Sequence, residues 1–237
     1  MKVSLFVPCF MDAMYPEAAI SAVRVLERLG HEVAYSPAVT CCGQPAFNSG
    51  YWDEARQVAG RVLDAYASSD VVVSVSGSCG AMLKVFFPEL FRDERAQEAQ
   101  QLSDKVWEFS DFLVTKLRVL DVGARFPHRV TWHDGCHGLR EMNVQSQPRT
   151  LLANVRDLEL VEMDMAQTCC GFGGTFAAKF SDISTAMGEV KCKSAVETEA
   201  EYIVSGDSSC LMHIQGLLDR QKQPLQSLHL AQVLASE

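Results

Sequence analysis

The chain has 237 residues, enough for one large domain or two smaller ones that each bury a core. With 48% hydrophobic and 22% charged residues it has the composition of a soluble globular protein, which excludes a disordered chain. The formal net charge of −9 argues against nucleic acid as a partner, because such partners require a clustered basic face.

Strands and helices are predicted to alternate along the first 75 residues. The apolar run 2–7 predicts a buried strand, and apolar residues three and four apart from Pro16 to Leu29 predict a helix that Gly30 closes. A second strand is expected over 31–35, an amphipathic helix over 52–66 and a third strand over 71–75. This alternation is typical of a parallel sheet with right-handed crossovers.

The second half of the chain repeats the scheme. Residues 84–120 are predicted to be helical, with apolar positions from Val106 to Leu117 forming a long helix between the halves, and Gly123 and Pro127 mark the joint. Further strands are expected over 129–132, 158–161 and 202–204, and helices around 151–155, 183–196, 211–221 and 228–234. We therefore predict an α/β fold of two pseudo-symmetric Rossmann-like halves with short parallel sheets, residues 1–122 and 123–237.

Eight of the nine cysteines form one pattern written twice. A Thr-Cys-Cys-Gly segment occurs at 40–43 and again at 168–171, each with one cysteine upstream and one downstream. The second set follows the first by 127 residues at the first cysteine, 128 at the pair and 131 at the last. The two sets are Cys9, Cys41, Cys42 and Cys79, and Cys136, Cys169, Cys170 and Cys210.

Each patterned cysteine comes after a predicted strand, so we expect the four of each set to meet at the carboxyl edge of a parallel sheet. The apolar run before Pro8 is too short for a signal peptide, and no stretch approaches the roughly 18 apolar residues of a membrane helix. We therefore expect a cytoplasmic protein without a membrane span. Thiols stay reduced in that compartment, so the cysteines are interpreted as metal ligands and not as disulfides.

Four thiolates suit a [4Fe–4S] cluster, and the glycine after each pair lets the backbone approach it and offer N–H donors. Zinc is the structural competitor, because four thiolates also suit tetrahedral zinc, although its usual closely spaced C-x-x-C pairs are missing. A further alternative is that the cysteines are small buried hydrophobic residues. Cys192 lies within a helical pattern and is assigned to the core.

The spacing resembles that of the CCG cysteine-rich domain family, which includes the cysteine-rich component of heterodisulfide reductase and the glycolate oxidase iron–sulfur subunit. Within this group the chain is most similar to the lactate utilization protein A family. The segments that carry the resemblance are 133–140 (HDGCHGLR) and 169–176 (CCGFGGTF) running into 183–187.

The resemblance implies one or two iron–sulfur clusters, most simply [4Fe–4S], held by the eight cysteines, with zinc in place of a lost cluster as the alternative. It also implies an electron-transfer subunit of a bacterial L-lactate oxidation complex, working with other lactate-utilization subunits that include a ferredoxin-like iron–sulfur protein. A heterodisulfide-reductase-like catalytic cluster and a zinc-binding structural or regulatory protein remain the other hypotheses. Whether the chain is an enzyme by itself stays open.

The chain departs from the fuller family motif in one respect. That motif ends each half in Cys-x-x-Cys, whereas here Ser76 and Asp207 stand in place of the first cysteine of each pair. The noncubane clusters associated with five cysteines are therefore in doubt, although serine or aspartate oxygen can also ligate iron. His133 and His137 flank Cys136, and for both a cluster-facing role and a structural role are open; His213 is assigned a structural role.

Overall fold

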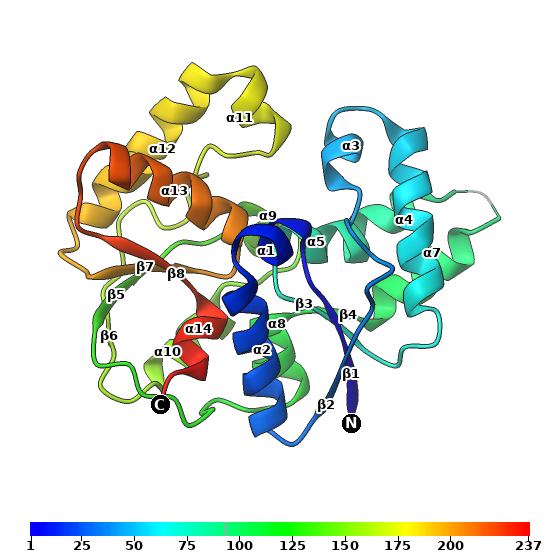
Figure 1. The fold of residues 1–237 in the computed structure, drawn as a ribbon, viewed down its shortest axis with the longest axis horizontal. Helices are drawn as coiled ribbons and strands as arrows, with labels where there is room; N and C mark the ends of the chain where they lie inside the picture. The colour runs from blue at the N-terminus through cyan, green and yellow to red at the C-terminus, as the bar shows by residue number, and fades with distance from the viewer. Residues whose placement is uncertain (93) are drawn as a thin grey trace.

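The computed structural model describes residues 1–92 and 94–237, and Figure 1 shows their arrangement. Two four-stranded sheets form, in the orders β2-β1-β3-β4 and β6-β5-β7-β8. All their strand pairs are parallel. The predicted α/β fold of two similar halves is therefore confirmed.

The first sheet and its helices come from the residues up to Lys116. In chain order these elements are β1 (Lys2–Phe6), α1 (Cys9–Met14), α2 (Pro16–Arg28), β2 (Glu32–Tyr35), α3 (Gln44–Asn48), α4 (Trp52–Tyr66), β3 (Val72–Ser74), α5 (Gly77–Ala81), the π-helical turn η1 (Met82–Phe86), α6 (Phe87–Leu90), α7 (Ala96–Lys105), β4 (Val106–Glu108), α8 (Phe109–Asp111) and the π-helical turn η2 (Phe112–Lys116).

The second sheet and its helices follow from Arg129. They are β5 (Arg129–Trp132), α9 (Cys136–Arg140), α10 (Ser146–Ala153), β6 (Glu159–Leu160), α11 (Thr175–Lys179), α12 (Ser181–Val196), β7 (Tyr202–Ser205), α13 (Ser208–Arg220), β8 (Gln226–His229) and α14 (Leu230–Ala235).

The long helix predicted from Val106 to Leu117 is wrong in its first turn. Val106–Glu108 is the strand β4, which pairs with β3, and helical structure covers only 109–116. The error arose because apolar residues at a strand end and in the next helical turn happen to be spaced three residues apart. The helical part does lie between the halves, since α8 and η2 pack against α10.

The last predicted helix, 228–234, also begins too early. Residues Gln226–His229 form β8, the edge strand beside β7, and α14 begins at Leu230. Each half therefore has a fourth strand that the sequence patterns did not predict. Both fourth strands end in a buried residue that caps the next helix, Glu108 before α8 and His229 before α14.

Three groups of buried hydrophobic side chains form the core. A central group includes residues from both halves, such as Leu5, Leu26, Phe112, Val130 and Leu234. Two outer groups each belong mainly to one half and pack under α4 and α12. Figure 1 shows α14, in red, lying against α2, in blue, in the middle of the molecule. The Arg28 guanidinium fixes this contact by donating hydrogen bonds to the carbonyl oxygens of Leu234 and Ala235.

Above this central core, the short helices α5 and α9 bring the halves together. A Cβ added to Gly77 would lie 2.8 Å from Cα of Gly138, so the two backbones approach too closely for a larger residue. Asp207 lies beside this contact and is buried. Within the described parts of the chain, no helix has both the length and the apolar character needed to cross a membrane.

We predict that Gly77→Ala destabilises the protein by about 1–3 kcal/mol, because the new methyl group must push α5 away from α9. The free energy of unfolding from urea titration measures the effect. Gly216→Ala is the matched control: it lies in α13 with open space around it, and alanine favours a helix over glycine by about 1 kcal/mol. Equal stability of wild type and Gly77→Ala would contradict the close packing.

Burial of Glu108 predicts a pH dependence of stability. Burial raises its pKa to about 7, although Ser110 and Asp111 donate hydrogen bonds to it. Between the ordinary pKa of 4.5 and pH 7 the folded chain keeps a proton that the unfolded chain has lost, so this group lowers the free energy of unfolding as pH rises.

The Glu108→Gln variant imitates the protonated acid. Its free energy of unfolding should therefore rise relative to that of wild type by up to about 3 kcal/mol between pH 5 and pH 8. Urea unfolding of both proteins at the two pH values tests this, and a difference that is the same at both would count against it.

Candidate metal centres

The four patterned cysteines of the first half meet beyond the carboxyl ends of β1, β2 and β3. Cys9 begins α1, Cys41 and Cys42 lie in the loop before α3, and Cys79 lies in α5. The Sγ atoms of Cys9 and Cys41 are 4.0 Å apart, and those of Cys42 and Cys79 are 3.3 Å apart. These distances are much longer than a disulfide bond, and all nine cysteines are free.

The second half reproduces this arrangement. Cys136 begins α9, Cys169 and Cys170 lie in the loop before α11, and Cys210 lies in α13. Cys136 and Cys170 lie near enough to Cys169 to shift its pKa, and Cys210 lies near enough to Cys170 to shift that of Cys170. The structure thus brings together each of the two cysteine sets expected from the sequence.

The thiols of each set control one another's protonation. In the first half, hydrogen bonds from Cys42 and Cys9 stabilise the Cys41 thiolate and lower its pKa to about 2. The same bonds raise the pKa of Cys9 and of Cys42. In the second half, Cys136 and Cys170 lower the pKa of Cys169 to about 2, and their own pKa values rise. In each set the pKa of one thiol is thus lowered and the pKa values of two of its neighbours are raised.

The glycine after each cysteine pair adopts a positive φ and donates a hydrogen bond to a sulfur atom. Gly43 and Gly171 have φ values of +87° and +92°, which favour glycine strongly, and a Cβ at Gly171 would lie 2.4 Å from the carbonyl oxygen of Ser184. The N–H of Gly43 donates to Sγ of Cys41, and that of Gly171 to Sγ of Cys169, each at 3.4 Å. The backbone donors expected from the sequence thus point at a sulfur atom in both halves.

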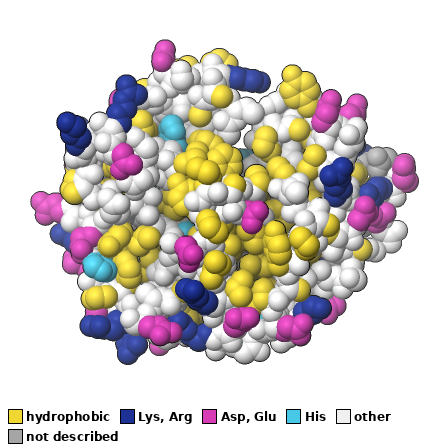
Figure 2. Space-filling view, in the orientation of Figure 1, with side chains coloured by type: hydrophobic (Ala, Val, Ile, Leu, Met, Phe, Trp, Pro, Cys, Tyr) yellow, Lys and Arg dark blue, Asp and Glu magenta, His cyan; other side chains and the backbone are white. Residues whose placement is uncertain are grey.

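All eight cysteines line one cavity of about 120 Å³ between the halves. Phe10 and Phe172, one from each half, also line it, and their rings make an edge-to-face contact with centroids 5.4 Å apart. Figure 2 shows that hydrophobic side chains gather in the middle of the face on which α1 lies, while most charged groups lie nearer its margin. The two thiol sets therefore share one recess.

Ser76 and Asp207, which replace the fifth cysteine of each half, are hydrogen bonded to each other. Oγ of Ser76 donates to Oδ1 of Asp207 at 3.1 Å. The Oγ atoms of Ser78 and Ser209 also contact Oδ1, and the N–H of Ser78 donates to Oδ2 at 2.9 Å. Both carboxylate oxygens of Asp207 are thus engaged in joining the halves, which does not favour them as iron ligands.

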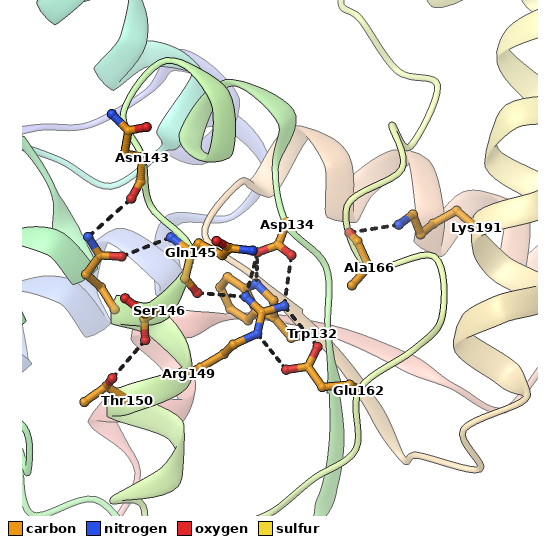
Figure 3. Close-up of polar contacts among 11 residues, drawn as sticks. Trp132, Asp134, Asn143, Gln145, Ser146, Arg149, Thr150, Glu162, Ala166 and Lys191 are labelled. Carbon is orange, nitrogen blue, oxygen red and sulfur yellow. Dashed lines mark hydrogen bonds and ion pairs between the residues drawn. The ribbon is translucent and has the colours of Figure 1, made fainter.

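A polar network that the sequence did not predict holds the loop between β5 and Cys136 (Figure 3). Buried Asp134 accepts two hydrogen bonds from Arg149, at 2.8 and 2.9 Å, and one from the indole N–H of Trp132 at 2.7 Å. Arg149 also pairs with Glu162. A buried carboxylate paired with arginine is well satisfied, so this loop is fixed where it passes the second thiol set.

The three histidines near the second set differ in environment. His133 is fully buried, and burial followed by the charge of Lys191 lowers its pKa to about 3. Its imidazole lies beside Cys170 and Cys210. His137 lines the cavity and lies 3.3 Å from a carboxylate oxygen of Glu141. His213 contacts the carbonyl oxygen of Ser184 at 3.3 Å and is not among the cavity-lining residues, in agreement with its structural assignment.

Cys192 is separate from both sets. It is fully buried in the outer core of the second half, with its Sγ 3.7 Å from the carbonyl oxygen of Ile214. It is not among the residues that line the cavity.

The donor atoms present fit an iron–sulfur cluster or a tetrahedral metal in each half. Four thiols converge in each set, and a bound cation would hold them as thiolates, since coordination deprotonates a thiol outright. The orientation of one backbone N–H toward sulfur in each half is the kind of contact that tunes such centres.

Comparisons with known proteins agree with this geometry. The family model "Cysteine-rich domain" (CCG) matches residues 3–84 and again 130–215, one match in each half. Lactate utilization protein A of Geobacillus thermodenitrificans (strain NG80-2) is 45% identical over 99% of this chain and 98% of its own length. The protein of that name from Geobacillus sp. (strain WCH70) is 44% identical over the full length of both.

The fold is also similar to that of a solved structure. A hypothetical protein from Helicobacter pylori aligns with 98% of this chain at a TM-score of 0.67 and 9% identity, and the chain spans about half (48%) of that protein's length. Two matched domain segments and full-length relatives above 40% identity lead to one conclusion. The chain belongs to the CCG cysteine-rich domain family and, within it, to the lactate utilization protein A family.

Proposed function

We propose that this protein is an iron–sulfur electron-transfer subunit of a bacterial L-lactate oxidation complex. The observation that carries the proposal is the convergence of eight thiols, four from each half, on one cavity. Each half holds one centre. The ligands of the first are Cys9, Cys41, Cys42 and Cys79, and those of the second are Cys136, Cys169, Cys170 and Cys210. The names of the full-length relatives supply the link to lactate.

The chemistry of lactate oxidation favours a relay over a complete enzyme. Oxidation of a 2-hydroxy acid to a keto acid releases two electrons, whereas iron–sulfur clusters pass electrons one at a time. The sequence has no flavin or nicotinamide fingerprint and no P-loop. Another subunit would then oxidise the substrate, and the two centres of this chain would carry the electrons onward.

Such a relay requires partners. We propose that it works in the cytoplasm with other lactate-utilization subunits, among them a ferredoxin-like iron–sulfur protein. Both thiol sets line one recess, so a partner that covers it would lie close to both centres.

A catalytic role for the cavity is the second candidate. Gln44, Thr175 and Ser208 line it together with the cysteines, so a small polar molecule entering it would meet hydrogen-bonding groups next to sulfur. A heterodisulfide-reductase-like cluster would then bind its substrate directly. A change in the EPR spectrum on adding L-lactate, and none with acetate, would favour this function over the relay.

Metal analysis after anaerobic purification tests the main proposal. We expect about four to eight iron atoms per chain with matching acid-labile sulfide, a brown protein, and an EPR signal after reduction. Zinc without sulfide, reproduced under strict exclusion of air, would instead identify a zinc-binding structural or regulatory protein and would overturn the electron-transfer function.

Cysteine substitutions should separate the two centres. Cys41→Ala should lose the iron of the first half alone, and Cys169→Ala that of the second, because each removes one of the four sulfur donors of its set, the one that accepts a hydrogen bond from the following glycine. Each variant is expected to keep about half of the iron and sulfide and to fail to restore growth on L-lactate in a deletion strain.

Cys192→Ala is the matched control, since it removes a buried thiol that does not line the cavity. Its iron content should equal that of wild type. An equal loss of iron from Cys192→Ala, or growth on L-lactate with both centres removed, would contradict the assignment.

A further inference from the structure

The two thiol sets have the same arrangement, but the buried residue three positions before the first cysteine differs between the halves. Phe6 lies three residues before Cys9 and pairs with Ser74 of β3. His133 lies three residues before Cys136, next to the end of β5, and takes the place of Phe6 in the second half. Both side chains are fully buried. An imidazole in the second half thus replaces a purely apolar ring in the first.

The His133 side chain has unused hydrogen-bonding capacity. Among the residues that the structure describes, neither Nδ1 nor Nε2 makes a hydrogen bond of good geometry, although the backbone of Ala166 lies near the ring. A buried polar atom without a partner destabilises a fold, so an imidazole with two such atoms calls for an explanation. One ring nitrogen and the Sγ atoms of Cys170 and Cys210 all lie within 4.8 Å of one another.

The surrounding structure holds His133 in this position. Its backbone N–H donates to the carbonyl oxygen of Val204 at 2.9 Å, and its neighbour Asp134 is locked by Arg149 and Trp132 (Figure 3). Buried Lys191 donates from α12 to the carbonyl oxygens of Met165 and Ala166, in the segment that leads to Cys169. The imidazole is therefore placed against the sulfur atoms by a fixed frame.

Lys191 is a second difference between the halves. Gly43 packs against Ala55 and Val58 of α4, and Gly171 packs in the same way against Ser184 and Met187 of α12, an offset of 129 residues. At this offset Lys191 corresponds to buried Val62 in the first half. His133 in place of Phe6 and Lys191 in place of Val62 thus both put a buried nitrogen in the second half where the first half has an apolar side chain.

Other side chains near the second set offer less to a metal beside Cys170 and Cys210. Oγ of Ser208 and Nδ1 of His137 also lack hydrogen-bond partners and their residues line the cavity, but Ser208 offers a neutral hydroxyl and Nδ1 of His137 lies 3.3 Å from a carboxylate oxygen of Glu141. Asp207, at the position of the missing cysteine, uses both carboxylate oxygens in hydrogen bonds to Ser76, Ser78 and Ser209. Among the histidines and acidic residues of the described ranges, His133 is the one whose donor atom lies within 4.8 Å of the Sγ atoms of both Cys170 and Cys210.

We propose that His133 ligates the metal centre of the second half through a ring nitrogen, together with Cys170 and Cys210. The second half then holds a mixed nitrogen–sulfur centre, whereas the first half, with Phe6 at this position, holds a sulfur-only one. This inference rests on the proposed function in so far as it requires a metal centre in the second half. Neutral imidazole is a ligand that both iron and zinc accept.

The test uses the full-length chain with ¹⁵N-labelled histidine, loaded anaerobically with iron and sulfide. Pulsed EPR of the reduced protein should show a histidine nitrogen strongly coupled to a cluster, and X-ray absorption at the iron edge should show an iron–nitrogen shell. Both should disappear in His133→Phe, which places the residue of the first half in the second. His213→Asn, a histidine of the same half whose Nε2 contacts the carbonyl oxygen of Ser184 and which is not grouped with Cys170 and Cys210, should retain both.

The outcomes separate this proposal from the function itself. Iron bound by wild type with no coupled nitrogen, or with the same coupling in His133→Phe, overturns the nitrogen ligand alone. Failure of wild type to retain iron or zinc overturns both. If zinc is the metal retained, the zinc edge is read for a nitrogen shell at about 2.0–2.1 Å.

A replacement ligand covers the case in which His133→Phe releases the metal of the second half. His133→Cys should then restore metal binding with a sulfur-only shell, because it returns a donor atom to the same place. Loss of metal in both variants, with circular dichroism like that of wild type, would assign His133 a packing role and overturn the proposal.

Discussion

The position of both thiol sets depends on how the two halves meet at the carboxyl edges of their sheets. At that edge Gly77 approaches Gly138, and the buried carboxylate of Asp207 accepts hydrogen bonds from Ser76 and Ser78 of the other half. Because Cys79 and Cys210 follow these residues in α5 and α13, the same contacts orient the cysteines. The positions that hold a fifth cysteine in the fuller family motif are thus used here to join the halves.

Much of this could be predicted from the sequence, because the signals were local or repeated. Alternating apolar runs indicated the parallel sheets, and the spacing of Cys9, Cys41, Cys42 and Cys79, repeated in the second half, indicated that each set would meet in space. The sheet edge explains why: parallel strands place the loops after them on one side, so cysteines distant in sequence converge.

Other features depend on tertiary contacts and had no local signal. The fourth strands, β4 and β8, are only three and four residues long and continue into helices, so their apolar spacing imitates a helix. The environment of His133 could not be predicted either. The sequence around a histidine three residues before a cysteine does not tell whether the side chain is exposed or buried. The loop before Cys169, to which Lys191 donates a hydrogen bond at Ala166, lies near the buried ring.

The contact of α14 with α2 has a consequence for the order of events in synthesis. The central core contains Leu26 from the start of the chain and Leu234 from close to its end, and Arg28 binds carbonyl groups of the last helix. Although domains generally fold from the N-terminus during translation, here the first half lacks part of its cover until residues 230–235 leave the ribosome. Packing of α2 in the first half is therefore completed only when the second half folds against it.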